Sequence, residues 1–398
     1  MTMYKDKCVV LGVCGGIAVY KALDVVSSLR KKGIEVRVIM TESATKFVTP
    51  LTFQSISQNM VVTDMFAEPK AWEIQHISLA QKADVMLIAP ATANIIGKVA
   101  NGIADDMLST TIMATKAKVI FAPAMNTNMY ENVIVQENIK KLKALGYEFI
   151  EPDSGRLACG DIGKGKLPKP EVIFEHVLTS LHPVKDLCGK KVLVTAGPTK
   201  ANIDPVRFIT NRSSGKMGYA IAKEARDRGA EVTLVTGAKG IEKPIGIEVI
   251  EIDTNSEMKE EISKRFDSCD IVIKAAAVAD YKPKNYSKEK IKKGEGSLNI
   301  ELTRDSDILK ELGEKNDKQI LVGFAAESSN LIENAKGKLE RKNLDYIIAN
   351  DITSQETGFG SDQNKVFVIS RDGNVNELDI MSKREVASNL FDIIGGKR

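Results

Sequence analysis

The chain has 398 residues, too many for one ordinary hydrophobic core, so its length predicts two domains. Hydrophobic residues make up 43% and charged residues 27%, as in globular proteins, and a formal net charge of +3 is too small to indicate nucleic-acid binding. No apolar run reaches the length of a membrane span and the start runs directly into a strand-like segment, so we expect a cytoplasmic protein without a membrane partner.

The cysteines argue against structural cross-links. There are five of them, scattered along the chain and never spaced as C-x-x-C. This pattern fits neither a disulfide framework nor a structural zinc site, so we expect reduced thiols.

A strand–helix–strand pattern opens the chain. Residues 8–13 form an unbroken apolar run that predicts a buried strand, residues 14–16 form a tight turn, and residues 17–32 have the spacing of an amphipathic helix. Further strands are predicted at 35–40, 85–89 and 119–122, each ending in small residues or proline. Parallel strands that alternate with helices bind ligands at their carboxyl ends.

The same order of elements returns after residue 190. A strand is predicted at 191–195, a helix from about 218 to 228 and a strand at 231–236. The connection at 181–190 lacks periodicity and contains chain breakers, so we place the domain boundary at 187/188, giving domains 1–187 and 188–398. The predicted fold class is α/β, with two doubly wound, Rossmann-like domains and mainly parallel sheets.

The turn Gly12-Val-Cys-Gly-Gly-Ile17 lies between a strand and a helix, an arrangement suited to anions because backbone amides at a helix N-terminus point at a phosphate. The spacing is not Gly-x-Gly-x-x-Gly, and Thr41 rather than an acid follows the second strand, so a mononucleotide fits better than a nicotinamide dinucleotide. The next residue, Glu42, is an acid, so binding of a nicotinamide dinucleotide stays an alternative.

Three residues in this half have both a functional and an ordinary interpretation. His76, on a predicted helix with apolar neighbours, could be a structural histidine, and Asn126 in Pro123-Ala-Met-Asn could cap a turn. Cys159 lies in the glycine-rich segment 154–166, where a buried structural cysteine is unexpected but an incidental loop thiol is not.

The second half contains a long polar loop, 204–218, with basic side chains, hydroxyl groups and glycines before a helix. These groups suit polyanions, although the loop is not a Walker motif and could be a solvated basic surface. Asp280 follows the strand 270–274, where a nucleotide or its magnesium ion would be met. The run Lys288–Gly296 could be no more than an exposed charged turn.

Taken together, these segments resemble, over nearly the whole chain, the bifunctional enzymes of coenzyme A biosynthesis. These enzymes combine a phosphopantothenate–cysteine ligase with a phosphopantothenoylcysteine decarboxylase. The resemblance implies FMN in the first half, with His76 beside the flavin, Asn126 on the substrate carboxylate and Cys159 as the acid. It also implies a set of flavin contacts: Gly15, Gly16, Ile17, Thr41, Ser43, Ala89, Thr92, Asn94 and Ser109.

In the second half the resemblance implies CTP with Mg²⁺. Asn211 would act on the activated acyl group, Arg207 on the substrate phosphate or carboxylate, and Lys290, in a strip with Lys292 and Lys293, on the charge of the phosphates. Asp280 would meet the metal. The implied nucleotide contacts are Ala276, Asp280, Lys290, Asp305, Ser306, Asp307, Ile308, Phe324, Lys338 and Lys342. Composition does not decide between CTP and ATP.

The implied chemistry runs from the second half to the first. Nucleotidyl transfer activates 4'-phosphopantothenate, and the amine of cysteine then displaces CMP. Flavin oxidation of the new thiol to a thioaldehyde provides the electron sink that decarboxylation requires, and Cys159 protonates the remaining enethiolate on the way to 4'-phosphopantetheine.

Two other interpretations stay open: a flavin-dependent decarboxylase of peptide C-terminal cysteines, and a flavin-binding regulatory protein. The presence of a ligase half disfavours the first, and the intact set of His76, Asn126 and Cys159 disfavours the second. The resemblance further implies a homo-oligomer, possibly a dodecamer built from trimers of the flavin domain and dimers of the ligase domain.

Overall fold

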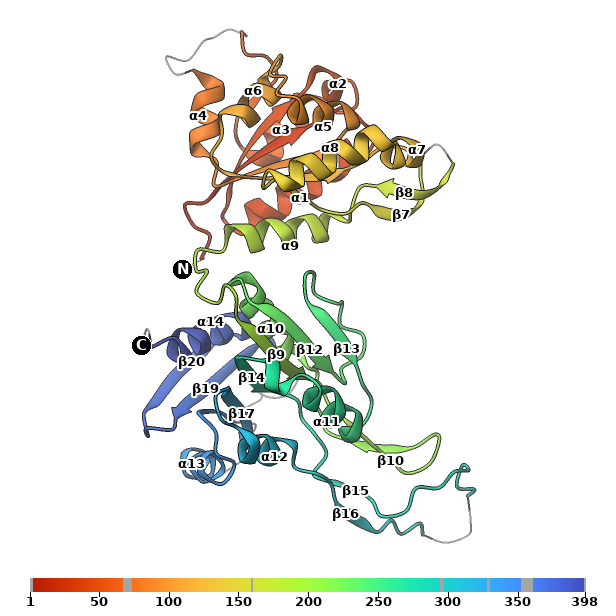
Figure 1. Ribbon diagram of the computed structural model, residues 1–398, viewed down its shortest axis with the longest axis vertical. Coiled ribbons are helices and arrows are strands. Elements are labelled where there is room, and N and C mark those ends of the chain that lie inside the picture. Colours follow the sequence, from red (N-terminus) through yellow and green to blue (C-terminus); the bar gives the residue numbers. More distant parts are fainter. Residues whose placement is uncertain are drawn as a thin grey trace. The chain divides into compact units, whose positions relative to one another are not determined.

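The computed structural model describes residues 3–66, 74–158, 160–293, 297–327, 330–351 and 361–396. The chain divides into two compact units, Met1–Pro183 and Val184–Arg398. Each unit has a central sheet with helices on both faces (Figure 1). The predicted α/β class with mainly parallel, doubly wound sheets is confirmed. Among the described residues, no helix is both long and apolar enough to cross a membrane.

The sheet of the first unit has six strands in the order β3-β2-β1-β4-β5-β6, and every neighbouring pair is parallel. Its strands are β1 (Cys8–Val13), β2 (Glu35–Met40), β3 (Val61–Val62), β4 (Val85–Ala91), β5 (Lys118–Pro123) and β6 (Glu148–Phe149). An antiparallel hairpin, β7 (Asp153–Arg156) and β8 (Ile162–Lys166), follows the sheet.

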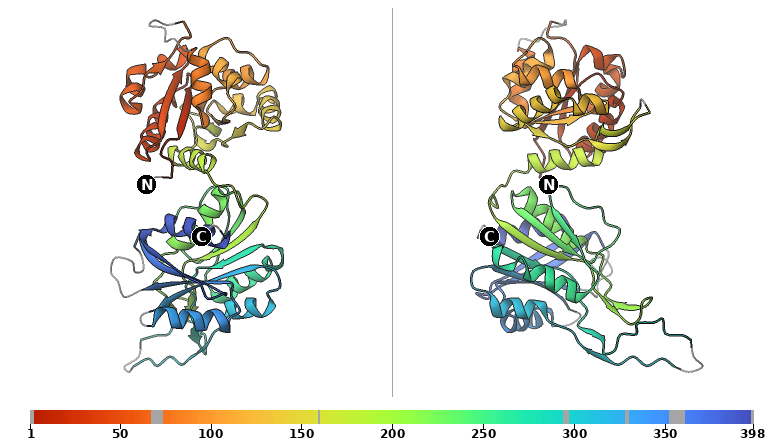
Figure 2. Two further views of the ribbon diagram at one scale, coloured as in Figure 1. Left: turned by 90° about the vertical axis from the view of Figure 1, so that its left-hand side faces the viewer. Right: turned by 45° about the vertical axis from the view of Figure 1, so that its right-hand side comes forward.

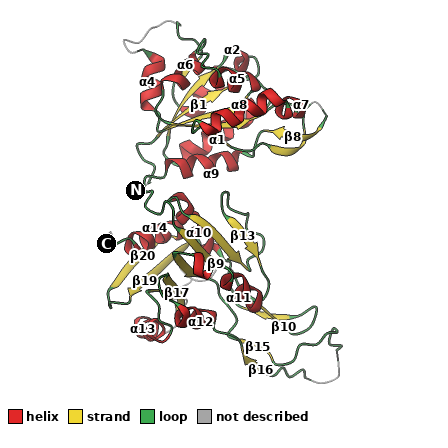
Figure 3. Cartoon of the chain, in the orientation of Figure 1, coloured by secondary structure: helices red, strands yellow, loops and turns green. Residues whose placement is uncertain are grey.

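Helices cover both faces of this sheet, which explains why all six residues of β1 are buried. Val9 and Leu11 pack in a core with α1 (Val19–Lys31), α3 (Pro50–Ser57) and α9 (Pro170–Leu181), whereas Val10 packs in the opposite core. The opposite core includes α4 (Gln75–Lys82), α5 (Ala93–Ala100), α6 (Met107–Ala114) and α8 (Val133–Ala144). Short helices α2 (Glu42–Thr45) and α7 (Thr127–Glu131) complete the unit (Figure 3).

The second unit has a sheet of eight strands in the order β13-β12-β9-β14-β17-β18-β19-β20, of which the last two strands pair antiparallel. Its strands are β9 (Lys191–Ala196), β12 (Glu231–Thr236), β13 (Glu248–Glu251), β14 (Ile271–Lys274), β17 (Ile320–Glu327), β18 (Tyr346–Asp351), β19 (Gln363–Ser370) and β20 (Val375–Ser382). One face packs on α10 (Lys216–Asp227) and α14 (Lys383–Ile394). The other packs on α11 (Asn255–Ser263), α12 (Ile308–Lys315) and α13 (Leu331–Arg341), with a short 3-10 turn at Phe266–Ser268.

Two small antiparallel pairs lie outside this sheet. The first joins β10 (Lys200–Asn202) to β11 (Phe208–Thr210), and the second joins β15 (Tyr281–Pro283) to β16 (Leu302–Arg304). Residues 281–293 and 297–304, here together called the arm, extend away from the sheet of their own unit (Figure 2).

The predicted regular elements are confirmed, and strands 8–13, 35–40 and 231–236 have the predicted bounds. Helix starts differ by two residues. The first helix begins at Val19, not at residue 17, and α10 begins at Lys216, not at residue 218. Gly215 precedes α10 with a φ of 80°, a left-handed conformation that favours glycine, and this turn sets where the helix begins.

A buried charge network holds α10 and α14 together in the second unit. The guanidinium of Arg228, only 1% exposed, donates to Glu224 Oε1 at 2.9 Å and to Asp392 Oδ1 at 2.7 Å. It also donates to Asp186 at 3.2 Å and to the backbone oxygen of Ser388 at 2.9 Å. Each hydrogen bond of this cation replaces hydration that burial removes.

Arg228→Met should destabilise the second unit by about 3–5 kcal/mol, because the buried carboxylate of Glu224 loses its buried partner Arg228 and keeps the partly exposed Arg384. Hydrogen exchange of α10 and α14, followed by mass spectrometry, measures the loss of protection. Lys264→Met, which removes an exposed lysine paired with Glu260 and Glu261, is the control and should leave protection unchanged. Equal protection in wild type and Arg228→Met would contradict a stabilising role for the network.

Candidate active sites

A cavity of about 900 Å³ opens at the carboxyl ends of β1, β2 and β4 in the first unit. Its lining includes residues from the turns that follow these strands. Five of the predicted flavin contacts lie there together: Gly15, Thr41, Ser43, Thr92 and Asn94. Parallel pairing explains this grouping, since it brings the ends of all these strands to one edge of the sheet.

The turn after β1 combines tight packing on one side with open space on the other. A Cβ on Gly15 would lie 2.4 Å from Ser43 Cβ, so only glycine permits this contact with the turn after β2. A Cβ on Gly16 would have nothing within 4 Å. The turn leads directly into α1, which begins at Val19. The geometry is that of an anion cradle at a helix N-terminus.

A second cavity, of about 670 Å³, adjoins the first and shares Gly15, Thr92 and Met129 with it. It contains the predicted residues Gly16, Ile17 and Asn126, together with Arg156 and Lys166 of the β7–β8 hairpin. The structure therefore brings Asn126 to the same place as the glycine turn.

Hydrogen bonds to described residues hold Asn126 in position. Its Oδ1 accepts from the backbone N–H of Asn128 at 2.8 Å, and its Nδ2 donates to Asp161 Oδ2 at 2.9 Å. Glycines let the β7–β8 hairpin approach this segment closely, because a Cβ on Gly163 would lie 2.5 Å from Thr127 Oγ1. The predicted acid Cys159 lies outside the described residues, but its neighbours Leu157 and Ala158 line the same cavity.

Three predicted residues do not line these cavities in the described part of the first unit. Ala89 is buried in β4, and Ser109 is buried in α6, where it forms a capping box with Asp106. His76 lies half-buried on α4. Ser109 still contributes indirectly. Burial raises the pKa of Asp106, but hydrogen bonds from Lys98 and Ser109 outweigh burial and hold that pKa below its usual range at the cavity edge.

In the second unit, a cavity of about 480 Å³ lies at the ends of β14 and β17 and at the start of α12. It gathers most of the residues predicted to act on nucleotide or acyl group: Asn211, Ala276, Asp280, Asp305, Ser306, Asp307, Phe324, Lys338 and Lys342. These residues are spread over more than 130 positions of sequence, from 211 to 342, yet they line one cavity.

Hydrogen bonds fix several of these side chains. Asn211 Nδ2 donates to the backbone oxygen of Val278 at 2.7 Å. Asp307 caps α12 and pairs with Lys342 at 2.8 Å, while Asp305 pairs with Lys282 at 3.0 Å. Burial, the largest single cause, raises the pKa of both aspartates, but the hydrogen bonds from lysine and from neighbouring N–H groups, together with the lysine charges, outweigh it. Both pKa values therefore lie below their usual range.

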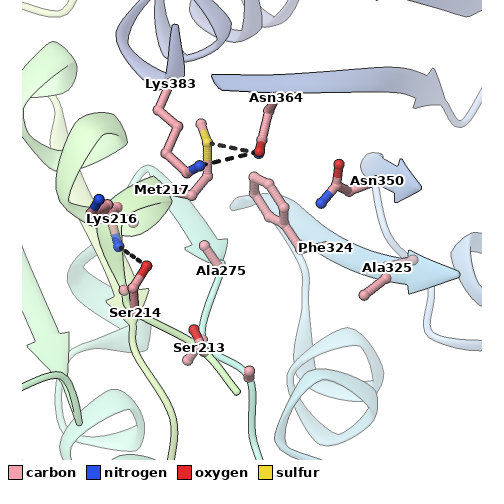
Figure 4. A pocket seen from close by; sticks show the side chains of 15 residues that line it. Ser213, Ser214, Lys216, Met217, Ala275, Phe324, Ala325, Asn350, Asn364 and Lys383 are labelled. Atoms are coloured by element: carbon pink, nitrogen blue, oxygen red, sulfur yellow. Dashed lines mark hydrogen bonds between the residues drawn. The ribbon is translucent and has the colours of Figure 1, made fainter. Parts of the chain in front are cut away.

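A smaller cavity, of about 140 Å³, lies at the N-terminus of α10 and shares Phe324 with the larger one (Figure 4). Ser213, Ser214 and Lys216 reach it from the predicted anion-binding loop. Lys383 and Asn364, which sequence reasoning missed, reach it from α14 and β19, and Lys383 Nζ donates to Asn364 Oδ1 at 3.2 Å. Nothing in the local sequence of either residue signals this position.

Three predicted residues of the second unit are not brought to either cavity among its described residues. Ile308 is 2% exposed and belongs to the core under α12. Arg207 donates to the backbone oxygen of Ile291 at 3.1 Å, so it lies against the arm, and the exposed Lys290 directly precedes Ile291 in the sequence. Arg207 and Lys290 are thus close in the fold to each other and separate from the residues that line the nucleotide cavity.

Sequence reasoning also missed Lys274, the last residue of β14, which lines the larger cavity and is 8% exposed. Burial lowers the pKa of its ammonium to about 8. The charge of Lys342 lowers that pKa further, whereas Asp307 and Asp280 oppose the shift. A lysine at the end of an apolar run was the available signal, but the strand pattern alone does not say what its side chain meets.

Comparisons with known proteins agree along the whole chain. The Flavoprotein family profile matches residues 1–182, and the profile described as DNA/pantothenate metabolism flavoprotein C-terminal domain matches residues 187–396. The chain is 50% identical over 397 residues to the Coenzyme A biosynthesis bifunctional protein CoaBC of Bacillus subtilis (strain 168), covering 98% of this chain and 97% of that protein. It is 46% identical over 395 residues to the protein of the same name from Borreliella burgdorferi, covering 98% and 100% respectively.

Among solved structures, the crystal structure of the C-terminal domain of a Coenzyme A biosynthesis bifunctional protein CoaBC is 44% identical, with a TM-score of 0.46 over 53% of this chain and 96% of that chain. The full-length relatives and the two profiles show that the chain belongs to the family of coenzyme A biosynthesis bifunctional proteins. It is accordingly an enzyme with a phosphopantothenoylcysteine decarboxylase part and a phosphopantothenate–cysteine ligase part.

The two glycines of the first turn should respond differently to alanine. Gly15→Ala should lower the stability of the first unit by about 1–3 kcal/mol, because its Cβ overlaps Ser43. Gly16→Ala should leave the melting temperature unchanged but weaken flavin retention, because its Cβ enters the open side of the turn. Thermal unfolding and the absorbance of released flavin measure the two effects. Flavin retention equal to wild type in Gly16→Ala would argue against an anion cradle at this turn.

Proposed function

We propose that the enzyme joins cysteine to 4'-phosphopantothenate through an acyl-cytidylate formed from CTP, and then decarboxylates the product to 4'-phosphopantetheine with FMN. One observation carries the proposal: residues implied separately by the two reactions gather in separate units, around the glycine turn with Asn126 in the first and around a single cavity in the second. Family membership supports the pathway.

The residues of the first unit fit a flavin mononucleotide. The glycine turn at the start of α1 suits its phosphate, and the two adjoining cavities, of about 900 and 670 Å³, have the size of sites that hold a cofactor and a substrate. Bound FMN would supply the oxidation of the substrate thiol that makes loss of carbon dioxide possible.

The residues around the second of these cavities would orient the substrate and move its protons. The Asn126 amide is rigidly held and can donate to a carboxylate, and Arg156 and Lys166 place positive charge at the same cavity. Cys159, which follows Ala158 in the sequence, would donate the proton that completes the product. The role of His76 beside the flavin rests on the resemblance alone.

In the second unit, Asn211 and the basic residues of the larger cavity would hold the nucleotide and the acyl phosphate. Phe324 offers a ring to the base, and Lys338 and Lys342 offer charge to phosphates. Arg207 and Lys290 would meet these ligands only if the arm changes its position on binding.

Asp280 would hold Mg²⁺ jointly with the phosphates. Within the described ranges, no group of three or more histidine, cysteine or acidic side chains could hold a metal by itself. Magnesium commonly uses one or two carboxylates together with substrate phosphates, so a single aspartate is a sufficient protein contribution.

The alternative functions receive less support. A decarboxylase of peptide C-terminal cysteines does not need the second unit, and a regulatory flavoprotein does not need the nucleotide cavity. The homo-oligomeric state, including a possible dodecamer, and the cytoplasmic location stay predictions.

The proposal predicts two products from one purified protein. With 4'-phosphopantothenate, cysteine and CTP, the enzyme should release pyrophosphate and then carbon dioxide, and without cysteine it should release pyrophosphate but no carbon dioxide. Separate assays of the two products, with ATP in place of CTP as a comparison, test it. Carbon dioxide from a cysteine-ending peptide without pyrophosphate would favour the alternative decarboxylase.

Lys290→Gln should slow amide formation by about 100- to 1,000-fold, because it removes a positive charge from the transferring phosphates. Decarboxylation of added phosphopantothenoylcysteine should be unchanged, since that reaction develops no such charge. The matched control is Lys284→Gln, an exposed lysine of the same arm that pairs with Glu301 at 2.8 Å, and it should retain both activities. Wild-type ligase rates in Lys290→Gln at saturating CTP would remove Lys290 from the site.

A further inference from the structure

Lys274 occupies an unusual position for a charged side chain. It ends β14, a central strand that pairs with β9 on one side and β17 on the other. Its partner in the register of β17 is Gly323, where Leu344 and Leu309 already occupy the space that a side chain would take. The residue is 8% exposed and lines the same cavity as Asn211, Phe324 and Lys338.

The charges near Lys274 do not neutralise it. In the part of the chain that the structure describes, its Nζ forms no hydrogen bond or ion pair. The carboxylates of Asp307 and Asp280 contribute favourable charge, but neither forms an ion pair with Lys274, and Asp307 is already paired with Lys342 at 2.8 Å. Lys342 itself acts on Lys274 as a like charge.

An ammonium that is buried without a partner destabilises a fold, since burial removes its hydration and nothing replaces it. A methionine of similar length would fill the same space without that cost. A ligand that brings a negatively charged oxygen into the cavity would instead give the ammonium a partner in a poorly hydrated environment, where such a contact is strong.

We propose that Lys274 is a further ligand-binding residue of the ligase cavity, and that its ammonium donates to a phosphate oxygen of the bound substrate. The inference deepens the proposed function and rests on it. Two ligands of the reaction carry this chemistry: the triphosphate of CTP and the phosphate of 4'-phosphopantothenate. Either ligand would give Lys274 a negatively charged partner, which Asp307 does not provide because it is paired with Lys342.

The test compares the full-length wild type with Lys274→Met, a neutral side chain of similar size. The control is Lys310→Met, which removes an exposed lysine of α12 that faces Glu314 at 3.8 Å. Calorimetric titrations with CTP and with 4'-phosphopantothenate are carried out separately, and thermal unfolding is recorded without ligand. Lys274→Gln serves as a second neutral variant.

We expect Lys274→Met to bind one of the two ligands about 10- to 100-fold more weakly, as for a lost hydrogen bond to a charged group. The ligand affected identifies the source of the phosphate. We also expect the unliganded variant to melt at the same temperature as wild type or higher, because the unpaired charge is gone.

Three results would overturn the inference. Wild-type affinity of both neutral variants for both ligands would show that Lys274 meets neither phosphate. A lower melting temperature without ligand in both variants would indicate a structural role instead. A wild-type protein that binds neither CTP nor 4'-phosphopantothenate would reject the proposed function itself, and this inference with it.

Discussion

Parallel strand pairing is the constraint on which both units depend. A parallel connection has to cross over the sheet before the next strand begins, so the carboxyl ends of all the strands lie at one edge. In the first unit this edge places Gly15, Thr41 and Thr92 around one cavity, although they come from turns after three different strands. In the second unit it brings Asp280 to Phe324 in the same way. Helices on both faces make each sheet rigid enough to hold these turns in place.

The fold was accessible from sequence because its signals are local. The unbroken apolar run of β1 is what a strand covered on both faces requires, and the glycine turn after it marks where the helix begins. The short antiparallel pairs were not predicted. β10 and β11 have three residues each, so they are too short for a pattern of alternating side chains to be recognised.

Only part of the candidate site could be predicted from the sequence, and there is a physical reason why the other residues could not be placed. Motifs that directly follow strands were placed together, because the topology fixes their position. His76, Arg207 and Lys290 lie on a helix, a loop and an arm, and nothing local determines which way such segments point. For Lys274, the strand itself was predictable from the sequence. Whether a lysine at the end of that strand faces solvent or a cavity depends on α12 and α13, which come later in the chain.

The pairing of Asp307 with Lys342 has a consequence for which anions the ligase cavity admits. A small inorganic anion that approaches Lys342 has to displace a carboxylate at 2.8 Å, so it exchanges one ion pair for another with little net gain. A ligand with several charged oxygens can reach Lys338 and Arg212 at the same time, and those contacts add to the exchange. At Lys342 the internal carboxylate thus competes with an incoming anion, and this competition favours ligands that carry several charged oxygens over ligands that carry one.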